Sequence, residues 1–178
     1  MLDRLKKLIR GADASLPLKP EAKRVEHAFL GVLTPHADLP DVLAGRITHD
    51  RQSIDIDVDA ENGSVDEALA FAEMTVRSLS DIDAKARILL AADSLDKYNQ
   101  SWRFGDILLE DGSTEPFEKP RLSREEFCAN LRLETVSISG KNTITLWYDD
   151  NDMFWGHSLS VTSCDGLSFA DAHASMAG

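Results

Sequence analysis

Cysteine is scarce in this 178-residue chain, which contains only Cys128 and Cys164. The two residues form no Cys-x-x-Cys motif, so neither a redox dithiol nor a zinc site is expected, and two free thiols indicate a reducing, cytoplasmic location. No apolar run approaches the ~20 residues that a membrane-spanning helix needs. The N-terminus has no apolar signal core followed by a small-residue cleavage site, so we expect no export.

The motifs of common catalytic and cofactor-binding classes are also missing. The chain has no Gly-x-Gly-x-x-Gly, no P-loop, no nucleophile elbow and no His-Glu-x-x-His sequence. Ser163-Cys164-Asp165 has no histidine among its sequence neighbours that would make it a nucleophile motif. We therefore expect no cofactor, and the sequence argues against an enzyme of a familiar motif-bearing class.

Positive charge is in short supply, with 19 Lys and Arg against 31 Asp and Glu and a formal net charge of −12. Residues 1–24 are the exception, because they carry seven basic and three acidic side chains. Nucleic-acid binding depends on Lys and Arg displacing counterions, so the acidic remainder predicts no nucleic-acid partner. An acidic surface can instead attract a basic protein or a cation, or serve only solubility.

The basic segment has the pattern of a short amphipathic helix. Residues 1–10 place Leu2, Leu5, Leu8 and Ile9 on one helical face and basic side chains on the other. Gly11, Pro17 and Pro20 then predict a linker. We therefore divide the chain into a basic helix and linker at 1–20 and a single domain at 21–178. The helix could pack on its own domain, join a second copy in a homodimer, or lie on a partner or membrane surface.

Hydrophobic periodicity predicts that residues 21–178 form one α+β domain. The clearest strand is 52–59, where Ile54, Ile56 and Val58 alternate with acidic residues. Further strands are expected at 27–34, 43–49, 133–139, 142–149, 154–162 and 168–176. The expected fold is an antiparallel sheet of about six or seven strands, with two inserted helices packed on one face and a short third helix.

Three Ser-x-x-acid patterns predict where the helices begin. They are Ser64 with Glu67, Ser80 with Asp83, and Ser123 with Glu126, and they open helices that end near residues 79, 98 and 132. The stretch 99–122 is rich in Gly, Pro and acidic residues and is expected to be a loop, held to the body by Trp102 and Phe104. Gly140-Lys141 predicts a two-residue hairpin turn.

The richest candidate for a ligand or ion site lies in residues 149–157. Asp149, Asp150 and Asp152 could hold a hard cation, and His157 beside Trp155 could act as a base or ligand. The spacing is not that of an EF-hand, so no particular metal is assigned. Aspartates also favour a plain hairpin turn, and a histidine on the apolar face of a strand can be a core residue.

The C-terminal sequence resembles an uncharacterised bacterial family, domain-of-unknown-function family 2262. The resemblance rests on an acidic hairpin, the sequence Phe-Trp-Gly-His, an Asp-Gly turn and a closing Ala-Gly. The matching residues are Asp149, Asp150, Asp152, Phe154, Trp155, Gly156, His157, Asp165, Gly166, Asp171, Ala172 and Gly178. A looser likeness extends over residues 27–178, and the resemblance implies no activity.

These observations favour a non-catalytic binding or protein-interaction module, with a basic protein as its partner. Two alternatives remain open. One is a metal-assisted hydrolase that uses the cluster from Asp149 to His157. The other is a structural homo-oligomeric module, in which residues 1–10 form the dimer contact.

Overall fold

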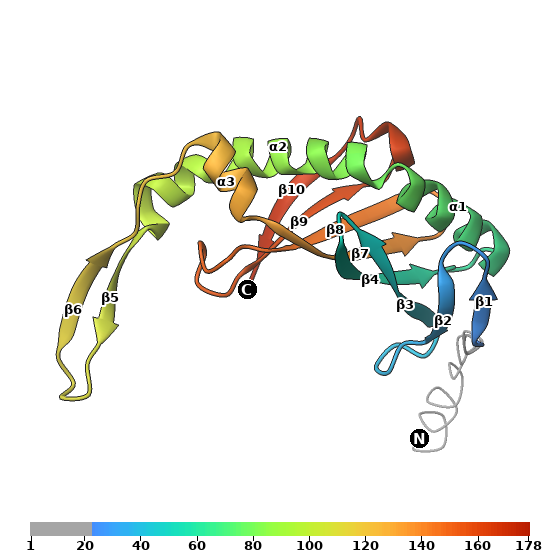
Figure 1. Ribbon diagram of the computed structural model, residues 1–178, viewed down its shortest axis with the longest axis horizontal. Coiled ribbons are helices and arrows are strands. Elements are labelled where there is room, and N and C mark those ends of the chain that lie inside the picture. The colour runs from blue at the N-terminus through green and yellow to red at the C-terminus, as the bar shows by residue number, and fades with distance from the viewer. Residues whose placement is uncertain (1–22) are drawn as a thin grey trace, which may run out of the picture.

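The computed structural model describes residues 23–178, which form a large sheet, helices on one of its faces, and a separate hairpin (Figure 1). The predicted N-terminal helix and linker at 1–20 lies outside the described residues. In spatial order the sheet contains β1 (Val25–His27), β2 (Gly31–Pro35), β3 (Val42–His49), β4 (Gln52–Asp59), β7 (Arg132–Ser139), β8 (Thr143–Asp149), β9 (Ser158–Ser163) and β10 (His173–Ala177). The helices are α1 (Val65–Arg77), α2 (Leu79–Lys97) and α3 (Arg124–Asn130), and a π-helical turn follows α2 at Tyr98–Trp102.

Within residues 23–178 the sheet is mixed and has eight strands, which corrects the expectation of an antiparallel sheet of about six or seven strands. Strands β4 and β7 are parallel, with Ile56 opposite Val136, whereas the other neighbouring strands run antiparallel. Parallel neighbours cannot be joined by a tight turn. The connection from β4 to β7 is accordingly long and contains all three helices. The α+β class, the two inserted helices and the short third helix are as predicted.

The hydrophobic core lies between the sheet and the helices. In β4 the side chains of Ile54, Ile56 and Val58 are buried, while the alternating Asp55 is exposed. Helices α1 and α2 cover the same face (Figure 1), and their residues Phe71 and Leu90 belong to the same core cluster. The opposite face, called the open face below, carries polar side chains. One row across it is Arg46, Asp55, Thr135, Trp147 and Ser160.

The helix starts were predicted correctly at two of the three positions. Ser64 precedes α1, although its side chain makes no capping hydrogen bond. Ser123 and Glu126 form the expected reciprocal capping box of α3. The capping role of Ser80 and Asp83 is wrong, because α2 begins at Leu79 and places Asp83 in the helix interior, where it is buried.

The predicted loop 99–122 contains a β-hairpin. Within residues 23–178, strands β5 (Phe104–Leu108) and β6 (Thr114–Glu118) pair only with each other, and they project from the body (Figure 1). Trp102 is half-buried against the core, whereas Phe104 is exposed. Neither face of this hairpin packs on the core, so its sequence has no apolar–polar alternation by which a strand is recognised.

The predicted hairpin of β8 and β9 is confirmed, with Leu146 opposite Val161. However, β9 begins at Ser158 rather than at residue 154, so residues 150–157 form a loop instead of a tight turn. Asn151 and Asp152, just after β8, and Trp155, before β9, adopt left-handed φ angles of 50°, 61° and 60°, which are incompatible with extended strand. The turn between β7 and β8 has three residues, 140–142, rather than the two expected.

Candidate functional site

The acidic loop, residues 149–157, is held together by its own carboxylates. Asp150 is only 4% exposed, and its carboxylate accepts hydrogen bonds from the backbone N–H groups of Asp152 (3.1 Å) and Phe154 (2.5 Å). Asp149 accepts from the N–H of Asn151 at 2.6 Å and from Arg132 at 2.5 Å. The backbone hydrogen bond from Asn151 and the contact with Arg132 hold the pKa of Asp149 below its ordinary value. Two of the three predicted carboxylates therefore shape the loop.

The aromatic half of the loop supports the base of the projecting hairpin. The indole N–H of Trp155 donates to the backbone carbonyl of Trp102 at 2.9 Å, and its ring centroid lies 5.3 Å from that of Phe117 in β6. Lys119 places its ammonium 5.6 Å from the centre of the Trp155 ring and donates to the backbone carbonyl of Asp152. The loop and the hairpin are thus joined by stacking, cation–π and hydrogen-bond contacts.

His157 faces the same junction. Its ring lies edge-on to Trp102 with centroids 5.0 Å apart, and its Nδ1 is 2.7 Å from the carbonyl oxygen of Phe154. In the neutral ring this contact assigns the proton to Nδ1, since a carbonyl only accepts. Nε2 is then left as the acceptor nitrogen of the ring.

Gly105 is the residue of β5 that leaves room for this arrangement. A Cβ added there would lie 2.0 Å from the Trp155 ring and 2.8 Å from Phe117, distances that real Cβ contacts do not show. Any larger residue at position 105 would displace Trp155, because the backbone of β5 runs directly against the indole. The position of the Trp155 ring therefore depends on the absence of a side chain at Gly105.

The structure brings the five predicted site residues into one loop but gives them different environments. The Asp150 carboxylate points into the loop, Asp149 pairs with Arg132, and Trp155 and His157 contact the hairpin base. Within residues 23–178 no three His, Cys, Asp or Glu side chains are grouped so that they could hold a metal ion. The contacts of Trp155 and Asp152 join the loop to the base of the hairpin.

The hairpin surface, residues 104–118, was missed by sequence reasoning. Phe104, Ile107, Leu108 and Leu109 are 44%, 51%, 72% and 39% exposed, which is unusual for four large apolar side chains within six residues. The same segment has five acidic side chains and no basic one. The signal available was Asp111-Gly112, a typical turn sequence, between the apolar residues 107–109 and the strand that contains Phe117.

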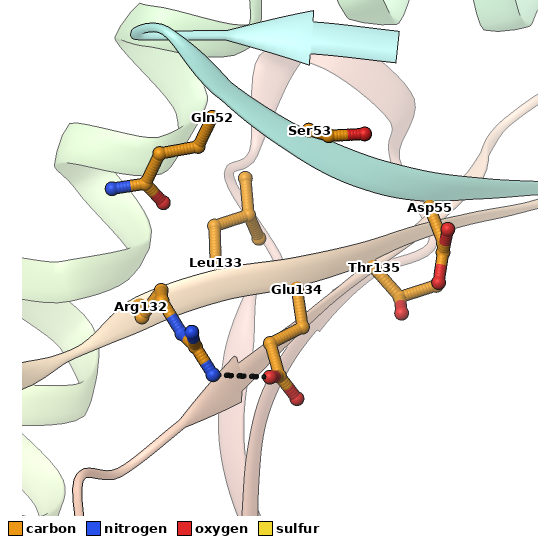
Figure 2. A pocket seen from close by; sticks show the side chains of 7 residues that line it. All are labelled: Gln52, Ser53, Asp55, Arg132, Leu133, Glu134 and Thr135. Carbon is orange, nitrogen blue, oxygen red and sulfur yellow. Dashed lines mark hydrogen bonds and ion pairs between the residues drawn. The ribbon is translucent and has the colours of Figure 1, made fainter. Parts of the chain in front are cut away.

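A second feature is a trough on the open face, where β4 and β7 separate (Figure 2). Its volume is about 510 Å³, and a neighbouring hollow of about 560 Å³ shares Asp55 and Thr135 with it. The trough is lined by Gln52, Ser53, Asp55, Arg132, Leu133, Glu134 and Thr135. Figure 2 shows Arg132 directed at Glu134, 2.8 Å away, and Asp55 pairs with Arg46 at 2.9 Å.

The charges of this trough are balanced by one another. In the neighbouring hollow, burial raises the pKa of Asp57, with nearby His36 acting in the opposite direction and Asp55 adding to the rise. A small polar ligand could enter such a surface. However, Arg46 and Arg132 are each paired with a carboxylate, so neither charge is in excess to attract an anionic or a cationic ligand.

An Asp150→Asn variant tests the structural role of the acidic loop. We expect it to lower the free energy of unfolding by about 1–3 kcal/mol, because an amide replaces a buried carboxylate that accepts two backbone hydrogen bonds. Urea unfolding followed by fluorescence measures this. Asp152→Asn, at an exposed carboxylate, is the matched control and should change stability by less than ~0.5 kcal/mol. Equal stability of the two variants would contradict this assignment.

None of the helices within residues 23–178 is both long and apolar enough to cross a membrane.

Comparisons with known proteins identify one match. No curated protein and no solved structure matches the chain. The model of a family described as "Uncharacterized protein conserved in bacteria", domain-of-unknown-function family 2262, matches residues 29–173, a range that includes the open-face trough, the hairpin and the acidic loop. The chain belongs to this bacterial family, as the sequence resemblance indicated.

Proposed function

We propose that this protein is a non-catalytic protein-interaction module and that the hairpin surface is its contact region. The observation that carries the proposal is the exposure of Ile107, Leu108 and Leu109 on a ribbon that stands away from the body (Figure 1). An isolated two-stranded hairpin is marginally stable in water, and exposed apolar side chains add nothing to its stability in the free protein. A partner that covers these side chains would bury their apolar surface and would also stabilise the hairpin.

The contacts that hold the base of the hairpin against the body support the same function. Its base is held by the contacts of Trp155 with Phe117 and Lys119. A rigid base lowers the entropy lost when a projecting element binds, which favours association. The acidic side chains around the apolar residues favour a partner with basic and apolar groups. We place this interaction in the cytoplasm, in keeping with the two free cysteines.

A double substitution in the hairpin tests the proposal. Ile107→Ser with Leu108→Ser should leave the fold unchanged, because both side chains are exposed, but should abolish partner binding. The measurement is affinity capture from the native bacterium with quantitative mass spectrometry, comparing parent and variant. The matched control is Val32→Ser with Ile88→Ser, two similarly exposed side chains on other elements. A partner captured equally by the parent and both variants would refute the hairpin as the contact region.

The alternative of a metal-assisted hydrolase at Asp149–His157 depends on whether the loop carboxylates can bind a cation. Each carboxylate oxygen of Asp150 accepts a hydrogen bond from a backbone N–H group, and Asp149 is paired with Arg132. A divalent cation bound there would compete with these bonds for the carboxylate oxygens. Calorimetric titration of the parent and of Asp150→Asn with calcium, magnesium, manganese and zinc separates the cases: cation binding that the substitution removes would support the hydrolase.

A further inference from the structure

We propose that the hairpin surface binds the N-terminal segment, residues 1–12, of a second copy of this chain, so that two copies exchange contacts in a dimer. This inference rests on the proposed function and names the partner. The segment has the sequence MLDRLKKLIRGA, with four basic side chains, one acidic side chain and four large aliphatic residues. It is the most basic part of a chain whose net charge is −12.

The hairpin and this segment are complementary in two independent properties. The hairpin has five acidic side chains and no basic one. Glu118 is paired with Arg103 just outside the hairpin, and the other four, Asp106, Glu110, Asp111 and Glu115, complement the excess of basic side chains in the segment. The exposed Ile107, Leu108 and Leu109 provide apolar area for Leu2, Leu5, Leu8 and Ile9. Apolar contact surrounded by opposite charges is the usual composition of a specific interface.

The trough on the open face is a poorer acceptor for the same segment. Its carboxylates Asp55 and Glu134 are already paired with Arg46 and Arg132, whose charges would repel a basic segment. The open face also carries mainly polar side chains around the trough, with little to cover the aliphatic residues of the segment. Charge and apolar area therefore both favour the hairpin.

The point at which the described chain begins favours a contact between copies. The described chain begins beside β1, an edge strand of the sheet, whereas the hairpin projects from the opposite end of the molecule (Figure 1). Two copies related by a twofold axis can each offer a hairpin to the other's N-terminal segment. Such an exchange makes two equal contacts, doubles the buried area and closes the assembly at two copies.

Charge reversal in the full-length chain tests the inference. By light scattering, the parent should have twice the 19.6 kDa chain mass. One variant carries Lys6→Glu, Lys7→Glu and Arg10→Glu, and the other carries Glu110→Lys, Asp111→Lys and Glu115→Lys. Each variant alone should be monomeric, because both of its contacts now join like charges. An equimolar mixture should form a heterodimer, because both contacts again join opposite charges.

The control variant reverses three exposed carboxylates outside the hairpin, Asp38, Asp50 and Asp81, and should remain dimeric. A monomeric parent, a dimer that survives hairpin reversal, or variants that fail to combine on mixing would each overturn the inference. The proposed function is judged separately by the Ile107 and Leu108 capture experiment. Hairpin-dependent capture of another protein, with a monomeric parent, would defeat this inference alone.

Discussion

Replacement of Asp83 by alanine is expected to lower the free energy of unfolding by about 3–5 kcal/mol. The carboxylate of Asp83 is buried beneath α2, where it accepts from the hydroxyl of Tyr148 at 2.7 Å and from the Nε of Arg87 at 3.0 Å. Arg87 also donates to the backbone carbonyls of Cys128 and Leu131. Loss of the carboxylate would leave a partly buried guanidinium without its counter-charge and a buried hydroxyl without an acceptor.

Two further variants assign this effect to the buried network. Tyr148→Phe removes only the hydroxyl, whose pKa is raised by burial and by the neighbouring Asp83, and should cost about 1.5–3 kcal/mol. Asp93→Ala removes another aspartate of α2, which pairs with Lys97 at the same i,i+4 spacing but at the surface. It should cost less than ~1 kcal/mol. Urea unfolding of all three variants measures the difference; equal losses for Asp83→Ala and Asp93→Ala would contradict the network.

The strands that bury one face could be predicted from the sequence. In 52–59, and again in β7 and β8, apolar residues recur at every second position because one side of each strand meets the helices. Periodicity reports which face is buried but not which strand lies alongside. Periodicity therefore could not predict that β4 and β7 pair in parallel. The long connection between these two strands was the remaining clue, and the hairpin within that connection was not recognised.

The role of Asp83 shows a different limit of sequence reasoning. Ser80 and Asp83 have the spacing of a capping box, and local sequence contains nothing against it. The position of the helix start depends on tertiary contacts, since Leu79 is buried in the core. The partner that gives Asp83 its role, Tyr148, is 65 residues away in the sequence.

The residues of the candidate site are close in the sequence, and the structure places them in one loop with left-handed φ angles at Asn151, Asp152 and Trp155. The residue types alone cannot distinguish a cation site from a loop whose carboxylates accept hydrogen bonds from its own backbone. The difference depends on the direction of the N–H groups of Asp152 and Phe154, which the local sequence does not reveal. The projecting hairpin gave no hydrophobic periodicity, so its contact with this loop was unforeseen.

Phe154 joins these parts of the molecule, and Phe154→Ala is expected to cost about 3–5 kcal/mol of unfolding free energy. The ring is fully buried and meets three others edge-on, with centroids 6.0 Å away at Tyr98, 5.6 Å at Trp102 and 6.2 Å at Phe127. Those rings belong to the π-helical turn that leads into the hairpin and to α3. A cavity here would loosen the acidic loop and the hairpin base together.

Hydrogen exchange distinguishes this linked effect from a general loss of stability. Under native conditions, the amides of 104–118 and 150–157 should exchange faster in Phe154→Ala, while those of the distant β3 and β4 should change less, because local opening needs less free energy than global unfolding. Phe154→Leu, which keeps most of the volume, should recover much of the stability and protection. Phe104→Ala, at an exposed ring, is the matched control and should leave the loop unchanged. Uniform acceleration over the whole sheet in Phe154→Ala would show that Phe154 supports the core in general rather than the mounting of the hairpin.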